Sequence, residues 1–375
     1  MKNHTRKKTI LILGAGFAGC TAAYLLKQNN FDVRVLEKNE FSGGGCRTHW
    51  YGGHPYTSGP RIFFTRDEEI IKLMTSLIGI RQFYNKTWSY VEKDKQFYPY
   101  PIYFGDIPRM PDAKTIRLQL KKRKDRVPST KNFEEYWLDA VGPNLYYKFI
   151  DKYSKKMWGI GSNKELSADF QWVNKGTSIR EKDTRLYGDM FQGYPAVADG
   201  YNQFFNKALK GCKFMGECSI DFFDPKTRKI KTNKGEFSGD IIINTISVDT
   251  LFKNALGPLK YSGRKFLKVV LPAEQILPKD IVWIHYTGEE PFTRVTEFKK
   301  ITNYKSKDTL LGIEIPSQDG QHYPVQTEAE KEKFRQYQEL FPKDFYSIGR
   351  LGSFSYKGIP DVMRDAVDTV KNILS

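Results

Sequence analysis

Residues 9–19 of the 375-residue chain read TILILGAGFAG, and this stretch decides the fold. The apolar, partly β-branched run at 9–13 predicts a buried strand, and the small and apolar residues at 20–26 predict a packed helix after the glycines. Residues 31–37 (FDVRVLE) alternate as a second strand that ends in an acid. Strand, glycine turn, helix and strand in this order predict a Rossmann-type βαβ unit, which binds dinucleotides.

The glycine spacing indicates how such a unit would hold a pyrophosphate. Gly14 permits the tight turn out of the strand, Gly16 lets the pyrophosphate approach the backbone, and Gly19 lets the helix pack on the sheet. The free N–H groups at the helix N-terminus, beginning at Phe17 and Ala18, would then face the pyrophosphate.

The residues after the second strand favour FAD over a nicotinamide dinucleotide. Glu37 can accept hydrogen bonds from the adenosine ribose hydroxyls, and Lys38 follows it. A glycine cluster comes next, and it adds Gly44, Gly45 and Cys46 to the predicted cofactor site. Such a cluster is typical of the glutathione-reductase-like FAD fold, because it lets the cofactor run close to the backbone. A nicotinamide dehydrogenase has no such need, so we expect FAD.

The rest of the chain predicts a helical region and an antiparallel sheet. Residues from about 100 to 156 are mostly helical, residues 239–245 are a short buried strand, and four alternating strands of an antiparallel sheet are expected at 265–271, 281–286, 293–298 and 309–315. Helices are expected at 327–340 and 360–374. The fold class is therefore α/β, a Rossmann-like FAD-binding domain with a helical insertion and an antiparallel β-sheet domain. The expected domains are 1–84, 197–250 and 324–375 for FAD, 85–165 for the helices, and 166–196 with 251–323 for the sheet and substrate.

Composition limits the partners. A formal net charge of +17 suits nucleic acid, anionic lipid or a small polyanion such as a nucleotide diphosphate, but no nucleic-acid-binding module is evident. The 4 cysteines form no C-x-x-C pair and no histidine cluster accompanies them, so we expect no metal site. No apolar run approaches the roughly 20 residues of a spanning helix, and no signal peptide is evident, which predicts a cytoplasmic protein.

Six further blocks of sequence resemble UDP-galactopyranose mutase and its relatives, in order and nearly end to end. Residues 59–65 (GPRIFFT) look like the family's GPHIFHT segment beside the flavin, and residues 152–159 (KYSKKMWG) are similar to its KYTRKQWG block. Residues 192–195 with 200–201 resemble QGLP…GGY, and residues 293–298 resemble TRITEH. Residues 322–325 and 349–356 resemble YYPI and GRLGTYRY. By these blocks the chain is identified as a divergent member of the family.

The resemblance implies a chemistry. Such mutases interconvert the pyranose and furanose forms of a nucleotide-diphosphate sugar, and they require reduced FAD although no net redox occurs. The flavin N5 attacks the anomeric carbon and expels the diphosphate; the sugar–flavin adduct opens, recloses on a different hydroxyl and recaptures the diphosphate. The substrate would be UDP-galactose, which leads to galactofuranose for polysaccharide or capsule biosynthesis, or a related sugar such as UDP-N-acetylgalactosamine, a deoxy-sugar or a heptose. NADPH or NADH would reduce the flavin.

Single residues take roles through the same resemblance. Arg294 would contact the substrate pyrophosphate, and Tyr323 and Tyr356 would donate their hydroxyls to it. Arg350 would lie beside the flavin and stabilise negative charge on the reduced ring.

Other matched positions allow two interpretations. Asp361 and Val362 open the last helix, whose N-terminal dipole would face the flavin, although capping alone also explains Asp361. Tyr153 and Trp158 match positions near the sugar and the mobile loop, although a buried helix anchor equally explains Trp158.

The sequence departs from the family pattern beside the sugar. Arg61 stands where the galactose enzymes have His, and as a cation next to sugar and flavin it is a candidate catalytic residue; Phe64 replaces a second His. Gly358 stands where the family has Asp. The mobile-loop arginine that grips the diphosphate has two candidate counterparts, Lys175 and Arg180. These departures leave the identity of the substrate sugar open.

Two other functions fit the N-terminal unit. A flavin oxidoreductase of the amine-oxidase or desaturase type shares this fold, and it would consume oxygen or another acceptor with its substrate. A non-catalytic flavin- or nucleotide-sugar-binding protein would bind a nucleotide diphosphate without turnover. Association into a homodimer is a further expectation from the bacterial relatives.

Overall fold

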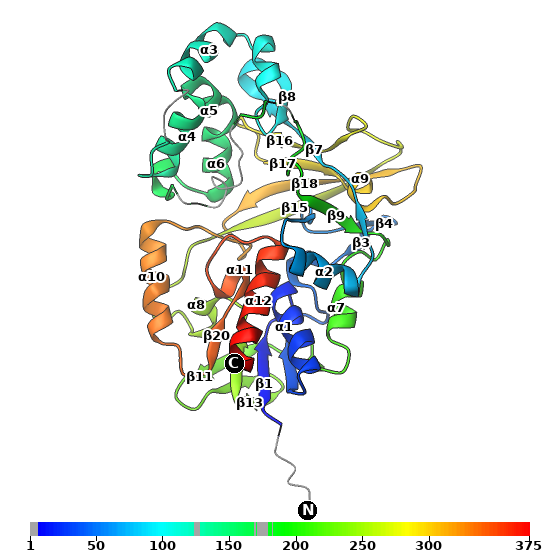
Figure 1. Cartoon of the computed structure of the whole chain (residues 1–375), viewed down its shortest axis with the longest axis vertical. Coiled ribbons are helices and arrows are strands. Elements are labelled where there is room, and N and C mark those ends of the chain that lie inside the picture. Colours follow the sequence, from blue (N-terminus) through cyan, green and yellow to red (C-terminus); the bar gives the residue numbers. More distant parts are fainter. Residues whose placement is uncertain (1–6, 124–127, 169, 171–178, 182) are drawn as a thin grey trace, which may run out of the picture.

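The computed structural model describes residues 7–123, 128–168, 170, 179–181 and 183–375. Figure 1 shows a Rossmann-like half, which carries both β1 and the C-terminus, below an antiparallel sheet that is capped by a group of helices. Among the helices that the structure describes, none combines the length and the apolar character that a bilayer-spanning helix needs.

A five-stranded parallel sheet forms the centre of the Rossmann-like half. Its first strand, β1 (Thr9–Leu13), is fully buried and lies between β2 and β14 in the order β10-β2-β1-β14-β20. The predicted βαβ unit is therefore confirmed: α1 (Phe17–Gln28) connects β1 to its parallel neighbour β2. The remaining strands are β2 (Asp32–Leu36), β10 (Lys213–Met215), β14 (Ile241–Asn244) and β20 (Phe345–Ser347).

The C-terminal helix α12 (Ile359–Leu374) packs beside α1 against this sheet (Figure 1). Its apolar face is buried, as the spacing of its apolar residues predicts. Arg364 donates to both carboxylate oxygens of Asp67, the N-cap of α2 (Glu68–Leu77), at 2.6–2.9 Å. The last helix is thereby fixed to elements from the start of the chain, and its N-terminus faces the site described below.

A seven-stranded sheet forms the second half, in the order β19-β15-β18-β17-β16-β7-β8. All its neighbours are antiparallel except β16 and β7, which are parallel. The four predicted strands are present with slightly different ends. The strands are β7 (Lys86–Val91), β8 (Gln96–Tyr100), β15 (Tyr261–Leu271), β16 (Ile281–Tyr286), β17 (Arg294–Glu297), β18 (Thr309–Ser317) and β19 (Tyr323–Pro324).

The expected helical domain at 85–165 differs from the structure at its start. Strands β7 and β8 occupy residues 86–100 and join the seven-stranded sheet through β16. The sequence did not predict this placement because β7 pairs with a segment about 195 residues away, and the pattern of a single strand does not identify its partner. The helices begin only afterwards, with α3 (Ala113–Lys121), α4 (Phe133–Val141), α5 (Pro143–Phe149) and α6 (Asp151–Trp158).

The helical group is tied to the sheet by a buried ion pair. The Lys148 ammonium pairs with Asp94 and with Asp112, the latter at 3.0 Å. Lys148 and Asp94 are both almost fully buried, which orients α5 on the loop between β7 and β8. Such pairs are favoured only when each charge is compensated. Helix α6, which carries two predicted site residues, follows α5 directly and packs against it.

Small sheets and short helices complete the fold. Strand β9 (Phe191–Pro195) joins β5 (Phe63–Thr65) and β6 (Ile80–Gln82) between the two halves. The other strands are β3 (His49–Tyr51), β4 (His54–Tyr56), β11 (Ile220–Asp224), β12 (Lys229–Thr232) and β13 (Gly235–Ser238). The other helices are α7 (Asn202–Ala208), α8 (Val248–Leu251), α9 (Phe298–Thr302), α10 (Glu328–Glu339) and α11 (Gly349–Gly352).

Candidate active site

The glycine turn after β1 leaves an open cradle in front of α1. Gly14 has a φ of +96°, which favours glycine, and a Cβ at Gly19 would lie only 2.0 Å from the Gly14 carbonyl oxygen. A Cβ at Gly16 would meet nothing within 4 Å, and the nearest atom to a Cβ at Gly44 would be the Gly16 Cα at 3.6 Å. The backbone of the glycine turn therefore borders an open space, and the free N–H groups of Phe17 and the next residues of α1 lie beside that space.

Glu37 lies at the edge of this cradle. Its carboxylate accepts from the Ala15 backbone N–H at 2.8 Å and from the backbone N–H and side-chain amide of Asn39 at 3.0 and 2.8 Å. These three bonds fix the buried carboxylate, and two oxygens with four lone-pair sites can accept one more donor. Lys38, next to it, is exposed.

The second glycine cluster leads from the cradle to a cleft between the two halves. Gly44 to Cys46 form a short 3-10 turn, and the Arg61 Nε donates to the Gly45 carbonyl at 3.0 Å. Burial raises the pKa of the Cys46 thiol, and the nearby Arg61 and Arg350 guanidiniums oppose that shift only in part. Cys46 therefore stays a neutral thiol in the cleft wall.

The cleft has a cationic side and an apolar side. About 1150 Å³ of space outside the atoms lies in it, open solvent included. The cationic side holds arginines and tyrosines, whereas Ile62, Phe64, Leu186, Tyr187, Met190 and Ile359 form the apolar side, here called the apolar wall. The described residues that line the cleft are Cys46, Pro60, Arg61, Ile62, Phe64, Met157, Arg180, Leu186, Tyr187, Met190, Trp283, His285, Arg294, Tyr323, Arg350, Tyr356, Gly358 and Ile359.

Tyr323 and Tyr356 lie at the centre of the cationic side. Their rings stack with centroids 5.5 Å apart, and the Arg350 guanidinium lies 4.8 and 5.3 Å from the two centroids. The Arg264 guanidinium lies 4.9 Å from the Tyr323 centroid, and the Arg61 Nη1 lies 3.4 Å from its hydroxyl oxygen.

These cations change the titration of the two phenols. Burial alone would raise the pKa of Tyr323, but Arg61, Arg350 and Arg264 outweigh burial and lower this pKa to about 8. Burial, followed by the neighbouring Tyr323, raises the pKa of Tyr356. The cleft is therefore an environment that stabilises added negative charge, and Tyr323 responds to it most strongly.

Arg294 reaches the same cleft from β17 and is paired with a buried acid. Its Nε and Nη2 each donate to one carboxylate oxygen of Glu314 on β18 at 2.7 Å, in a bidentate pair. Burial disfavours the Glu314 anion, but Arg294 together with Arg264 and Arg61 outweighs burial and lowers the pKa of Glu314. The same pair raises the pKa of Arg294 against the effect of its burial. The Arg294 guanidinium is therefore rigid, and its remaining N–H groups face the cleft.

Arg350 is held by backbone carbonyls. Its Nε and Nη2 donate to the Lys357 carbonyl at 2.9 and 2.6 Å, and its Nη1 lies 3.4 Å from the His322 carbonyl. Gly358, which stands where the family has Asp, lines the cleft beside it.

The start of α12 reaches the cleft as well. Asp361 accepts from the Gly358 backbone N–H at 2.7 Å, which caps the helix, and Val362 is buried. The capping interpretation of Asp361 therefore has a contact in the structure, and a role toward a cofactor stays a prediction.

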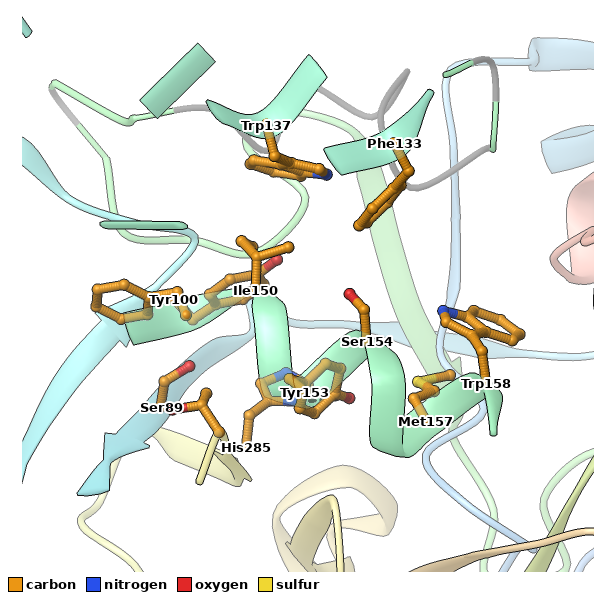
Figure 2. Close-up of a pocket in the computed structure, with 12 residues that line it drawn as sticks. Ser89, Tyr100, Phe133, Trp137, Ile150, Tyr153, Ser154, Met157, Trp158 and His285 are labelled. Atoms are coloured by element: carbon orange, nitrogen blue, oxygen red, sulfur yellow. Dashed lines mark hydrogen bonds between the residues drawn. The ribbon is translucent and has the colours of Figure 1, made fainter. Parts of the chain in front are cut away.

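A second cavity, lined largely by aromatic residues, lies next to the cleft (Figure 2). In Figure 2, Phe133 and Trp137 of α4 lie across the cavity from Tyr153 and Trp158 of α6. Trp158 is 2% exposed and contacts Tyr323 and Tyr356 edge-on, at centroid distances of 6.1 and 5.8 Å. About 450 Å³ of space outside the atoms lies in this region, open solvent included, and the cavity shares His285 and Met157 with the cleft.

The two candidates for the mobile-loop arginine have different outcomes. Arg180 lines the cleft, its backbone bonds to Ile102 and Phe104, and its Nε is buried with no acceptor among the residues that the structure describes. Lys175 lies outside the described residues.

Several site residues escaped prediction. Glu314, Arg264, Trp283, His285 and Tyr187 each line the cleft or contact a residue that does. Glu314 lies opposite Arg294 through the register of β17 on β18, which the sequence of neither strand indicates by itself. Across the described ranges, no group of three or more His, Cys, Asp and Glu side chains could hold a metal ion.

Comparison with known proteins decides the family. The profile of UDP-galactopyranose mutase matches residues 148–356, which is more than half of the chain. The chain belongs to the UDP-galactopyranose mutase family. A second profile, of an NAD(P)-binding Rossmann-like domain, matches residues 12–77 around the glycine turn.

Relatives of this mutase family match over nearly the whole chain. The dTDP-fucopyranose mutase of Escherichia coli is 26% identical over 376 residues, which cover 96% of each protein. The probable UDP-galactopyranose mutase of Klebsiella pneumoniae is 23% identical over 386 residues, which cover 98% of this chain and 95% of that protein. A crystal structure of reduced UDP-galactopyranose mutase superposes with a TM-score of 0.83 at 18% identity, over 98% of this chain and 96% of that one.

These matches confirm the predicted family and the predicted class of enzyme, an isomerase of the mutase type. They also confirm the α/β fold with its Rossmann-like domain. Together the family and the Rossmann-like domain indicate a flavin-dependent enzyme that acts on nucleotide sugars.

Proposed function

We propose that this mutase interconverts the pyranose and furanose forms of a nucleotide-diphosphate sugar with reduced FAD as its cofactor. The observation that carries the proposal is the convergence of Arg61, Arg294 and Arg350 with two stacked tyrosines in one cleft. This cleft opens beside the glycine cradle, so one ligand in the cradle and another in the cleft would meet.

The residues of the cradle fit FAD. A Cβ at Gly16 would project into open space that a pyrophosphate can fill, and the α1 N-terminus beside it offers unpaired N–H groups. Glu37 would take the ribose hydroxyls, and Lys38, Gly44, Gly45 and Cys46 continue the path toward the cleft. When bound and reduced, FAD supplies an electron-rich ring nitrogen as the nucleophile for the anomeric carbon.

The cationic side of the cleft would bind the diphosphate. Arg294 presents its remaining N–H groups from a rigid fork, and Tyr323 and Tyr356 offer hydroxyl donors beside it. Arg180, with its unpaired buried Nε, is the described candidate for the mobile-loop arginine. These donors are present before the anion leaves, so they stabilise the expelled diphosphate without having to reorganise.

Arg350 and Arg61 would act at the reacting end. Arg350 is fixed by the Lys357 carbonyl and lies near the start of α12, so both cation and helix dipole favour negative charge on the reduced ring. Arg61 is anchored to Gly45 and aimed at the Tyr323 hydroxyl, so it connects the cofactor side of the cleft to the diphosphate side. With Asp361 and Val362 at the first turn of α12, they complete the proposed cofactor site.

The apolar wall favours a sugar with a missing hydroxyl. Phe64 and Tyr187 stack face to face at 3.6 Å in this wall. Among the described residues that line the cleft there is no carboxylate or amide side chain, and arginine cannot accept a hydrogen bond. A sugar hydroxyl buried against the side chains of this wall other than Tyr187, whose hydroxyl oxygen can accept, would lose its acceptor at a cost on the order of 1–3 kcal/mol. Among UDP-galactose, an N-acetyl sugar, a heptose and a deoxy-sugar, a deoxy-sugar therefore fits best.

The aromatic cavity next to the cleft would take the base. Tyr153 and Trp158 face Phe133 and Trp137 across it (Figure 2), and stacking between such rings binds a flat base. Its connection to the cleft through His285 and Met157 suits a ligand whose diphosphate lies between base and sugar. The reductant, NADPH or NADH, and a homodimeric state stay predictions from the sequence.

Turnover of a panel of nucleotide sugars tests the proposal. The purified protein, reconstituted with FAD and reduced under argon, is incubated with the UDP and dTDP derivatives of galactose and of 6-deoxygalactose. NMR spectra of the sugar anomeric protons distinguish pyranose from furanose. We expect conversion of at least one substrate to its furanose form. Bound, reduced flavin without conversion of any of the four would contradict the proposal.

A further inference from the structure

A chain of hydrogen bonds behind the cleft involves two residues with no predicted role. Trp283 and His285 lie two residues apart on β16, so they face the same side of the sheet. The Trp283 Nε1 donates to the His285 Nε2 at 2.8 Å, and the His285 Nδ1 lies 3.1 Å from the Tyr153 hydroxyl oxygen. All three residues border the cleft or the aromatic cavity.

The direction of these bonds follows from the chemistry of the groups. An indole N–H can only donate, so the His285 Nε2 must be the unprotonated nitrogen of the ring. Burial, helped by the charge of Arg294, lowers the pKa of His285 well below its ordinary value, so the ring is neutral and carries one proton. That proton is then on Nδ1, and His285 donates to the Tyr153 oxygen.

Tyr153 must therefore direct its own proton elsewhere. Burial raises the pKa of Tyr153 to about 12, so the phenol stays protonated near neutral pH. Among the residues that the structure describes, the Tyr153 hydroxyl makes no second hydrogen bond. Besides His285, the charged and titratable groups that it faces are Tyr100 of the aromatic cavity and Arg294, Arg264, Glu314 and Tyr356 on the cationic side of the cleft.

The same chain reaches the diphosphate-binding side through Arg294. Arg294 of β17 lies opposite His285 in the pairing of β17 with β16. Its guanidinium lies 5.5 Å from the Trp283 ring centroid. Trp283 therefore contacts the group that would grip the diphosphate and, through its N–H, fixes the tautomer of His285.

We propose that Trp283 and His285 orient Tyr153 so that its hydroxyl is a dedicated hydrogen-bond donor to an oxygen of the bound nucleotide diphosphate. His285 and Trp283 are positioning residues in this proposal, and Tyr153 is the group that touches the ligand. The inference rests on the proposed nucleotide-sugar site, and it adds a donor to Arg294, Tyr323 and Tyr356.

A double-mutant cycle on the FAD-loaded protein tests the proposal, with the dissociation constants of UDP and dTDP measured by calorimetry. Tyr153→Phe and His285→Leu should each weaken binding roughly tenfold, the net effect of one hydrogen bond to a charged ligand. The double variant should bind no more weakly than the weaker single variant, because both remove the same donor. His285→Asn, whose amide can replace the Nδ1–H, should recover most of the affinity.

Two controls keep the result unambiguous. Tyr147→Phe removes an exposed hydroxyl from α5 and should leave both dissociation constants unchanged. In the unmutated protein, side-chain ¹⁵N NMR of the 5 histidines should show His285 protonated at Nδ1 and not at Nε2. Protonation at Nε2, or fully additive losses in the cycle, would overturn the proposal. If neither UDP nor dTDP bound the unmutated protein, the proposed function itself would fail, whereas the NMR result would still report on the tautomer.

Discussion

The bidentate pair of Arg294 and Glu314 gives the sharpest mutational prediction. Arg294→Ala removes the fork whose two N–H groups meet the Glu314 carboxylate at 2.7 Å, and with it the N–H groups that would bind the diphosphate in the proposed site. A hydrogen bond to a charged ligand contributes about 1.5–3 kcal/mol. Taking about 2 kcal/mol, we expect the dissociation constant of UDP or dTDP to rise roughly 30-fold.

The same variant should also lose stability, in a pH-dependent way. Glu314 is 3% exposed and Arg294 15%, and removal of one partner of a buried pair costs on the order of 3–5 kcal/mol. In the unmutated protein the lowered pKa of Glu314 stabilises the fold above the ordinary carboxyl value of about 4.3, and this contribution is lost as the pH falls below it. Without Arg294 the Glu314 anion loses its main compensation for burial and its pKa rises relative to the unmutated protein, so the deficit of the variant should grow as the pH rises from about 4 to 7.

Calorimetry and urea unfolding measure the two effects separately. Arg335→Ala on α10 is the matched control, because Arg335 is 62% exposed and pairs only at the surface with Glu332. It should change neither affinity nor stability. If Arg294→Ala bound both nucleotides within twofold of the unmutated protein, Arg294 would not belong to the site and the assignment of the cationic side would be refuted.

Three further predictions follow from the cleft. Because the pKa of Tyr323 is lowered to about 8, its hydroxyl loses its proton, and with it the hydrogen-bond donor, as the pH rises through that value. The affinity for UDP should therefore fall between about pH 7 and 9. A fall of the same size in Tyr323→Phe would assign the effect to another group. Phe64→His should shift kcat/KM from dTDP-6-deoxygalactose toward dTDP-galactose by about 10- to 100-fold, and an unchanged ratio would remove Phe64 from the sugar pocket. Gly16→Val should abolish retention of FAD on a desalting column while the melting temperature of the flavin-free protein is kept, because its Cβ meets no protein atom within 4 Å; a yellow variant would place the cofactor elsewhere.

The sequence pattern predicted those elements that are determined by residues close together in the chain. The glycine turn, α1 and Glu37 follow one another along residues 14–37, so the βαβ unit could be read directly, and β16 and α12 lie within a residue of their predicted ends. Strands β7 and β8 could not be assigned to the antiparallel sheet, because β7 joins it by pairing with β16, about 195 residues away, and β8 joins it through β7.

The same difference holds for the site, where residues in sequence motifs were predicted and their tertiary partners were not. Residues in ordered motif blocks, such as Arg294 and Tyr323, were predicted singly, and the structure brings them together in one cleft. Their partners were not predicted: Glu314 follows from the register of β17 on β18, and the stack of Phe64 on Tyr187 follows from tertiary packing between elements far apart in sequence. His285 carried no signal, because a lone histidine in an apolar strand most often fills a core.

The number of sugar molecules converted per reduced flavin tests the central claim most directly. FAD-loaded protein is reduced with one equivalent of dithionite under argon, without any electron acceptor, and is given a large excess of dTDP-6-deoxygalactose. A mutase regenerates its reduced flavin in every cycle, so we expect many furanose products per flavin and no loss of the reduced-flavin spectrum. Product limited to one equivalent, or reoxidation of the flavin in step with the substrate, would contradict the mutase and identify an oxidoreductase.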